Sequence, residues 1–98
     1  MFEKVYPRPR VDLLNAINDM IELLKAKITY SDTPHGKISF RIDYYGFLYE
    51  SRFTVTGIDQ NSARLRLDLT GPERGRQDML DRQAALLDSW LGKARAAA

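Results

Sequence analysis

Apolar and polar residues alternate along most of the chain between Lys37 and Thr70. A period of two is typical of strands that bury one face. The alternation breaks at Tyr45-Gly46 and in the polar segment 58–62, where turn-forming residues gather. The apolar positions are Ile38, Phe40, Ile42, Tyr44, Phe47, Tyr49, Phe53, Val55, Ala63, Leu65, Leu67 and Leu69. We therefore predict three consecutive antiparallel strands joined by two hairpins.

Side-chain chemistry predicts the register of both hairpins. A two-residue loop at Tyr45-Gly46 keeps the aromatic residues on one face, whereas a slip by one residue would turn them toward water. In the second hairpin the favoured register sets Arg52 against Asp68, whereas a shift by two would set it against Arg66. The predicted pairs are Tyr44 with Phe47, Ile42 with Tyr49, Phe40 with Ser51, Arg41 with Glu50, Val55 with Leu65, and Phe53 with Leu67.

An amphipathic helix is predicted before these strands, over residues 10–26, because apolar residues recur there at three- and four-residue spacing. A first strand is expected to follow from about residue 27. Its inward residues would be Ile28 and Tyr30, facing Phe40 and Ile38 across a turn at 32–36. A helix that continues as far as residue 29 is the alternative.

A second amphipathic helix is predicted over about 75–94, after Gly71-Pro72 ends the sheet. Segment 95–98 is expected to fray. The extended N-terminal segment 1–9 is expected to be a brief edge strand or a loose tail. We predict a single α+β domain over residues 1–98, in which a helix, a four-stranded antiparallel meander and a helix form a two-layer sandwich with both helices on one sheet face.

Composition limits the classes of function. The 98 residues include 15 basic and 13 acidic side chains, one histidine and no cysteine. Without cysteine, disulfides, thiolate metal sites and cysteine nucleophiles are excluded. No apolar run reaches the length of a membrane span, and the first residues lack the apolar centre of a signal peptide. We expect a soluble, cytoplasmic protein with no membrane partner.

No set of residues demands a particular catalytic chemistry. His35 lies in an expected turn, and the sequence supplies no carboxylate or nucleophile to pair with it. Acidic pairs such as Asp78 and Asp81 lack the further oxygen ligands that a hard cation needs. We therefore predict a protein that is not an enzyme and that uses neither a cofactor nor a metal.

The outer sheet face is expected to carry six basic side chains and three acidic ones, and two more arginines precede the second helix. The candidate residues of an anion or nucleic-acid face are Arg41, Arg52, Arg64, Arg66, Arg74 and Arg76. Sheets that bind RNA stack bases on exposed aromatic rings. Here the aromatic rings are expected on the inner face, so any nucleic-acid contact should be weak and independent of sequence.

The order of elements is similar to that of the double-stranded-RNA-binding domain, which has a helix, three strands and a helix. Members of that family carry a lysine cluster at the start of the second helix. The corresponding region here holds Arg74, Arg76 and Arg82 together with Glu73, Asp78 and Asp81. The resemblance is one of topology, and we do not assign the chain to that family.

The aromatic inner face supports a different hypothesis. Three tyrosines bring hydroxyl groups into an apolar layer, and each needs a partner or water if it is buried. Helices that stand off the sheet would leave an apolar pocket for a small molecule, whereas a packed core would place the hydroxyl groups at its rim. The candidate pocket residues are Tyr30, Phe40, Tyr44, Tyr49, Ser51, Phe53 and Trp90.

The last strand, 63–70, is expected to be an unpaired edge. Either segment 2–6 or a second copy of the chain would cover it, and the latter would form a two-fold dimer. The candidate dimer edge consists of Ala63, Leu65, Leu67 and Leu69. The leading hypothesis is a small non-catalytic interaction module that forms a homodimer through this edge or through the outer helix faces. A carrier or sensor of a small apolar ligand is the second, and weak nucleic-acid binding is the third.

Overall fold

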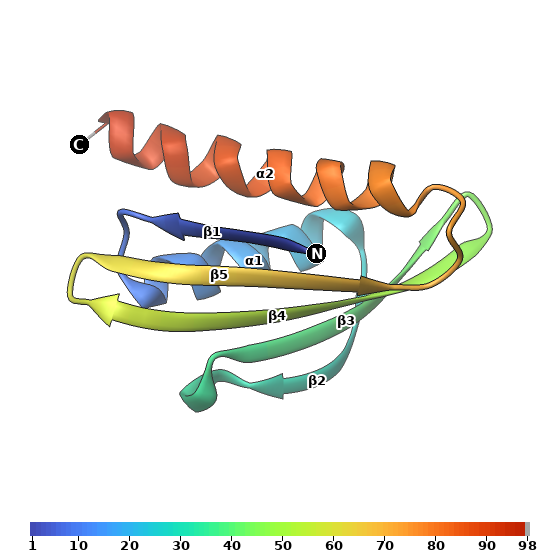
Figure 1. The fold of residues 1–98 in the computed structure, drawn as a ribbon, viewed down its shortest axis with the longest axis horizontal. Coiled ribbons are helices and arrows are strands. Elements are labelled where there is room, and N and C mark those ends of the chain that lie inside the picture. Colours follow the sequence, from blue (N-terminus) through green and yellow to red (C-terminus); the bar gives the residue numbers. More distant parts are fainter. Residues whose placement is uncertain (98) are drawn as a thin grey trace.

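The structure is a computed structural model that describes residues 1–97, with side chains given for residues 1–91. This part of the chain has an α+β fold (Figure 1), as predicted. The elements in order are β1 (Phe2–Tyr6), α1 (Arg10–Leu24), β2 (Lys27–Asp32), the 3-10 turn η1 (Thr33–His35), β3 (Lys37–Tyr44), β4 (Phe47–Asp59), β5 (Ser62–Thr70) and α2 (Arg76–Ala97). The segment expected to fray is helical as far as Ala97, and Ala98 lies outside the described residues.

The strands form one antiparallel sheet in the order β1-β5-β4-β3-β2. The predicted number of four strands is wrong, because β1 pairs with β5 and adds a fifth strand. Phe2 lies opposite Leu67, and Tyr6 lies opposite Ala63. Three residues of the expected dimer edge, including Leu65, therefore face a strand of their own chain, and Leu69 lies just beyond it. The free edges of the sheet are those of β1 and β2.

Side chains of β1 attach this strand to α2. The Tyr6 hydroxyl is part-buried and donates a hydrogen bond of 2.7 Å to Asp88 Oδ1, and Lys4 Nζ lies 2.9 Å from the same oxygen. The Lys4 ammonium also lies 5.0 Å from the centre of the Tyr6 ring, within the range of a cation–π contact. Five residues would form a weak strand alone, and these contacts explain why the segment is not a loose tail.

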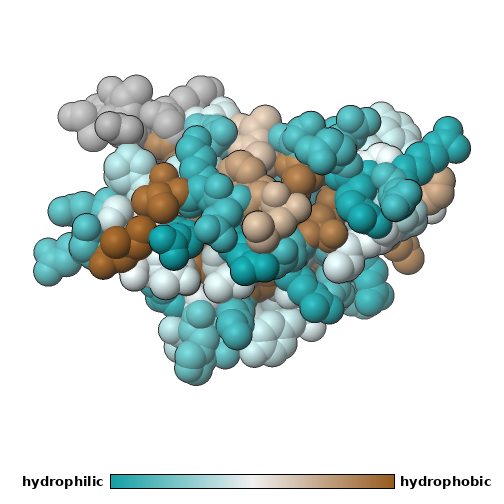
Figure 2. All heavy atoms as spheres, viewed as in Figure 1, coloured by the Kyte–Doolittle hydropathy of each residue, from teal (hydrophilic) through white to brown (hydrophobic). Residues whose placement is uncertain are grey.

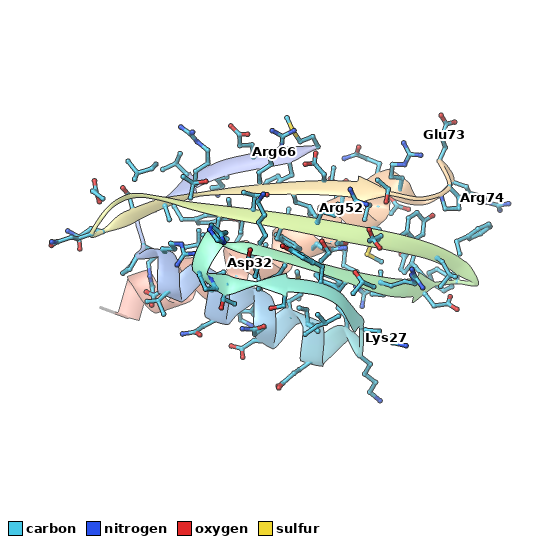
Figure 3. The ribbon with its side chains drawn as sticks, turned by 90° about the horizontal axis from the view of Figure 1, so that it is seen from below. Lys27, Asp32, Arg52, Arg66, Glu73 and Arg74 are labelled. Atoms are coloured by element: carbon cyan, nitrogen blue, oxygen red, sulfur yellow. The ribbon has the colours of Figure 1, made fainter. Side chains whose placement is uncertain are left out.

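Apolar side chains of the sheet share one hydrophobic cluster with residues of both helices, and we call the face that carries these side chains the inner face. One hydrophobic cluster includes Leu13, Ile17 and Met20 from α1, Leu80, Leu87 and Leu91 from α2, and Ile38, Phe40, Phe53, Val55, Leu65 and Leu67 from the sheet. In Figure 3 the ribbons of α1 and α2 lie behind the strands. The space-filling view in Figure 2 shows mostly hydrophilic residues, with smaller groups of hydrophobic residues among them.

The predicted registers of the two hairpins are confirmed, with Arg41 opposite Glu50 and the remaining pairs as expected. At the first turn, Tyr45 and Gly46 have φ values of 53° and 83°. Two consecutive left-handed residues are typical of the two-residue turn that matches the twist of the flanking strands. The Gly46 N–H donates a hydrogen bond of 2.9 Å to Asp43 Oδ1, which closes the turn.

The predicted orientation of Tyr30 is wrong. Ile28 lies opposite Phe40 as expected, but the register then shifts, and Tyr30 lies opposite Ser39 instead of Ile38. A β-bulge of this kind inserts one residue and redirects the side chains that follow. Tyr30 is 52% exposed and lies on the outer face of the sheet. The strand itself begins at Lys27, so the alternative of a longer first helix is excluded.

Candidate binding surfaces

Four predicted ligand-pocket residues are packed in the core. Phe40, Tyr49, Ser51 and Phe53 are each at most 1% exposed. The rings of Phe40 and Phe53 stack with their centres 5.7 Å apart. The Ser51 hydroxyl accepts a hydrogen bond of 2.8 Å from the side-chain amide of Gln83 in α2. These side chains fill the space between the sheet and the helices.

The three remaining predicted pocket residues lie apart from this group. Tyr30 lies on the outer face, and Trp90 lies beside a shallow hollow between α1 and α2. Tyr44 lies at the far end of the β3–β4 hairpin, where it is half-buried. The structure therefore does not bring the predicted set together around one pocket.

The end of the β3–β4 hairpin carries two adjacent hollows. The first, of about 410 Å³, is lined by Tyr44, Tyr45, Phe47, Tyr49, Arg74, Gly75 and Asp78. The second, of about 290 Å³, is lined by Leu23, Leu24, Ile42, Asp43, Tyr44, Tyr45, Met79 and Arg82. We call these two hollows and the residues between them the hairpin-tip surface. Figure 1 shows the turn of this hairpin beside the loop that leads into α2.

One tyrosine of this surface, Tyr45, is unusually exposed and lies on an unusual backbone conformation. Tyr45 is 84% exposed, and its ring meets the Tyr44 ring edge to face with the centres 4.6 Å apart. Phe47, opposite Tyr44 on the inner face, is 37% exposed. Tyr45 also has a left-handed backbone, which is disfavoured for a large side chain and is usually occupied by Asn, Asp or Gly. An exposed ring at this position gains little burial to offset the backbone cost.

The loop beneath the hairpin tip is fixed by close packing. The Tyr49 hydroxyl donates a hydrogen bond to the Arg74 carbonyl oxygen. A Cβ atom on Gly71 would lie only 2.7 Å from Tyr49 Cδ1, so the loop backbone can approach the ring this closely only as glycine. Arg76 Nη2 donates a hydrogen bond of 2.6 Å to the Gly71 carbonyl oxygen. These contacts hold the loop that lines the first hollow in one position.

The predicted anion-binding residues fall into two separate groups. Arg74 and Arg76 belong to the loop and helix start at the hairpin tip, and Figure 3 shows Arg74 at the end of the molecule, away from Arg52 and Arg66. Arg76 closes the loop, whereas Arg74 lines the first hollow. The other four arginines lie on the outer sheet face.

Most arginines of the outer face have a carboxylate partner. Arg52 Nε lies 3.0 Å from Glu50 Oε2, and Arg66 Nε lies 3.0 Å from Asp68 Oδ2. Arg64 Nε lies 3.9 Å from Oε1 of Glu3 in β1. The registers place Lys27, Lys37, Arg41, Arg52, Arg64 and Arg66 on this face together with Glu3, Asp32, Asp43, Glu50 and Asp68. Six cations therefore face five carboxylates, and the predicted excess of six to three is wrong.

The outer face contains a hollow of about 470 Å³, which we call the outer-face hollow. It is lined by Thr29, Tyr30, Lys37, Ser39, Glu50, Arg52, Phe53, Thr54 and Asp68. The bulge in β2 places both Thr29 and Tyr30 at its wall, because neighbouring bulge residues can point to the same side.

His35 has a carboxylate partner that the sequence did not reveal. The His35 ring atom Nδ1 lies 2.8 Å from Asp32 Oδ2, and the His35 backbone N–H donates a hydrogen bond to Asp32 Oδ1. Desolvation raises the pKa of Asp32, but the hydrogen bonds and charge of His35 hold it below its usual value. The pair caps the 3-10 turn. Among the described side chains, no three groups of the metal-ligating types lie close enough to share an ion.

No protein-family model matches the chain, and no curated protein sequence matches it either. Among the described residues, neither helix combines the length and the apolar character that a membrane span requires.

The sequence carries a signal for the hairpin-tip surface that the predicted sites do not include. The run Tyr44-Tyr45-Gly46-Phe47-Leu48 places four large aromatic or apolar residues around a two-residue turn. A solvated hairpin end needs none of them. The period of two correctly places Phe47 on the inner face, but it does not indicate where the covering helix begins, so the 37% exposure of Phe47 is not predicted.

Proposed function

We propose that the protein is a small, non-catalytic interaction module whose hairpin-tip surface binds an exposed segment of a partner protein. The observation that carries this proposal is the Tyr45 ring. It stands between two hollows, almost fully exposed, on a backbone position that disfavours tyrosine. Local strain that brings no gain in packing is typical of functional positions.

The chemistry of the surface supports a protein partner. Aromatic residues and arginine are enriched where proteins bind one another, and apolar centres with a polar rim are typical of such sites. Here the centre is formed by Tyr44, Tyr45 and Phe47, and the rim carries Arg74 and Asp78. Two hollows that flank one pair of rings fit two apolar side chains of a single segment.

The arrangement of the helices supports an open hairpin tip. We infer that α1 and α2 both cover the inner face, since residues of both belong to one hydrophobic cluster. Burial on the inner face decreases toward the turn, from Tyr49 at 1% exposed to Phe47 at 37%. The last inner-face residues of the hairpin therefore extend past the cover that the helices provide. The bond from Tyr49 to the loop braces this surface before binding, which lowers the entropy cost of association.

Peptide display against the full chain tests the proposal, followed by affinity measurement and NMR mapping of the selected peptides. We expect selected peptides to shift the amide signals of residues 44–48 and 74–78. Tyr45→Ala and Phe47→Ala should each weaken binding roughly tenfold or more, as for central residues of an interface. The matched control is Tyr30→Ala, which removes an exposed tyrosine ring from the opposite sheet face and should leave the affinity unchanged.

Two results would overturn the proposal. One is a selection that yields no peptide with saturable binding. The other is a set of peptides that bind elsewhere and are insensitive to Tyr45→Ala and Phe47→Ala. Retained amide dispersion in both variants will establish that a loss of binding is not a loss of fold.

A homodimer remains part of the proposal. Because β1 covers most of β5, we place its contact on the outer helix faces, the alternative that the sequence offered, or on the hairpin-tip surface. Sedimentation at high concentration tests for the homodimer, and a strict monomer excludes it.

A small aromatic or apolar molecule in the first hollow is the second candidate function, favoured by the rings of Tyr44 and Phe47. A thermal-shift screen with and without Tyr45→Ala distinguishes it. The cytoplasmic location stays a prediction.

A further inference from the structure

We propose that the outer-face hollow is a second, independent binding site, and that its ligand is a neutral polyhydroxylated molecule such as a short oligosaccharide. The site lies on the sheet face opposite to the hydrophobic cluster, and it does not depend on the function proposed for the hairpin tip. Its volume of about 470 Å³ lies within the range of small-molecule sites.

The β-bulge builds this site. With regular pairing, Tyr30 would lie opposite Ile38 on the inner face, but the register shift places it opposite Ser39 on the outer face. The ring is half exposed at the wall of the hollow, and its hydroxyl donates a long hydrogen bond of 3.4 Å to Asp32 Oδ2. An exposed tyrosine offers an apolar ring together with a polar end, which suits the C–H face and the hydroxyl groups of a sugar. All other lining groups lie on β2, β3, β4 and β5, so strands rather than loops fix their positions.

The charges of the hollow favour a neutral ligand. Two cations, Lys37 and Arg52, face two carboxylates, Glu50 and Asp68. Arg52 is tied to Glu50 and the neighbouring Arg66 to Asp68, each at 3.0 Å. A phosphate or carboxylate group of a ligand in this hollow would be repelled by the two carboxylates. An ammonium group of a ligand would be repelled by the two cations. The two cations and two carboxylates balance, so the lining has no net charge that would attract an anion or a cation.

The hydrogen-bonding groups are of the mixed kind that hydroxyl groups require. Four residues that line the hollow carry hydroxyl groups, namely Thr29, Tyr30, Ser39 and Thr54, and each hydroxyl group can donate and accept. In the described part of the chain, Arg52 uses only its Nε, so its terminal amino groups remain available as donors. The carboxylates supply acceptors. A ligand with hydroxyl groups, which both donate and accept, can form hydrogen bonds with the protein hydroxyls, the Arg52 amino groups and the carboxylates.

NMR titration of the full chain with a panel of neutral trisaccharides, built from glucose, mannose, galactose, xylose and N-acetylglucosamine, tests the proposal. We expect saturable shifts of the amides of residues 29–30, 39 and 52–54 with at least one member. Tyr30→Ala should weaken this binding roughly tenfold or more, because it removes the ring. Tyr30→Phe should retain most of it, and Tyr45→Ala is the matched control that should have no effect.

The salt dependence separates a saccharide from a polyanion. Binding of a neutral ligand should change little between low and high salt, whereas binding of a single-stranded oligonucleotide falls steeply with salt. Oligonucleotide binding at low salt that shifts the same amides and is lost on replacement of Lys37 and Arg52, the two cations of the hollow, would overturn the neutral-ligand assignment. Absence of saturable shifts with every trisaccharide, or shifts that Tyr30→Ala does not weaken, would overturn the site. The variants at Tyr30 and Tyr45 also keep failure of this proposal distinct from failure of the hairpin-tip proposal.

Discussion

Gln83 Nε2 donates a hydrogen bond of 2.8 Å to Ser51 Oγ in the core, where neither side chain is exposed. The bond joins α2 to β4. The second polar atom of the amide, Gln83 Oε1, has no hydrogen-bond partner among the described residues. A buried polar atom without a partner costs about 1–3 kcal/mol, so this contact holds the two elements together at a cost to stability.

Removing both polar groups should therefore be harmless or favourable. We expect the double variant Ser51→Ala with Gln83→Met to be at least as stable as the natural sequence. Ser51→Ala alone should lose about 1–3 kcal/mol, because it leaves the whole amide unpaired. Urea unfolding of the four proteins in a double-mutant cycle measures this coupling. A double variant less stable than Ser51→Ala would contradict the interpretation.

Gly36 and Gly46 share a left-handed backbone but differ in their surroundings. A Cβ atom on Gly36 would clash with the Val55 carbonyl oxygen, whereas one on Gly46 would meet nothing within 4 Å. Gly46→Ala should therefore cost about 1–2 kcal/mol, the penalty of the backbone conformation alone. Gly36→Ala should cost clearly more, since it also displaces β4 where Val55 N–H donates to the Gly36 carbonyl oxygen. Equal losses in chemical denaturation would refute this ranking.

Replacing Tyr45 by asparagine should stabilise the protein. Asparagine tolerates the left-handed conformation that Tyr45 adopts, and an Asn-Gly pair is the preferred sequence of this turn. We expect an increase of about 0.5–1 kcal/mol in the free energy of unfolding, with loss of peptide binding at the hairpin tip. Calorimetry of Tyr45→Asn beside Tyr45→Ala, which keeps the strain, checks the first part. A destabilised Tyr45→Asn would show that the ring contributes packing after all.

The attachment of β1 to α2 should weaken in acid. Desolvation raises the pKa of Asp88, but hydrogen bonds from Lys4 and Tyr6 and the charge of Lys4 lower it below its usual value of 3.8. A carboxyl with a lowered pKa in the folded state stabilises the protein above its unfolded pKa, and this contribution is lost as the pH falls through the folded pKa. Because the side chain is 46% exposed, we expect a contribution of at most about 1 kcal/mol.

The Asp88→Asn variant is the control for this pH dependence. It should be less stable than the natural sequence at neutral pH, and the difference should shrink as the pH falls below about 4, since both proteins are then uncharged at this position. Urea unfolding at several pH values measures the difference. A difference that does not change with pH would show that the Asp88 charge contributes nothing.

Two features of the structure could have been predicted from the sequence. Met79, Gln83 and Leu87 recur at a spacing of four on one helix face, which places a glutamine on the core side of α2. The run of aromatics at the β3–β4 turn was equally visible. Both signals were local. These local patterns do not report the position of the neighbouring helix or strand, and that position decides whether a side chain is buried or exposed.

The sequence by itself determined the two hairpins, their registers and both helices. These features depend on neighbours in the chain, because a period of two, a Tyr-Gly turn and the pairing of Arg52 with Asp68 are all short-range constraints. Only the tertiary structure decided the rest. β1 joins β5 across about sixty residues because that edge was free and Asp88 lay beside it. The bulge that turned Tyr30 outward and the hairpin tip that left Tyr45 uncovered depend on how distant segments meet, and no local pattern encodes that meeting.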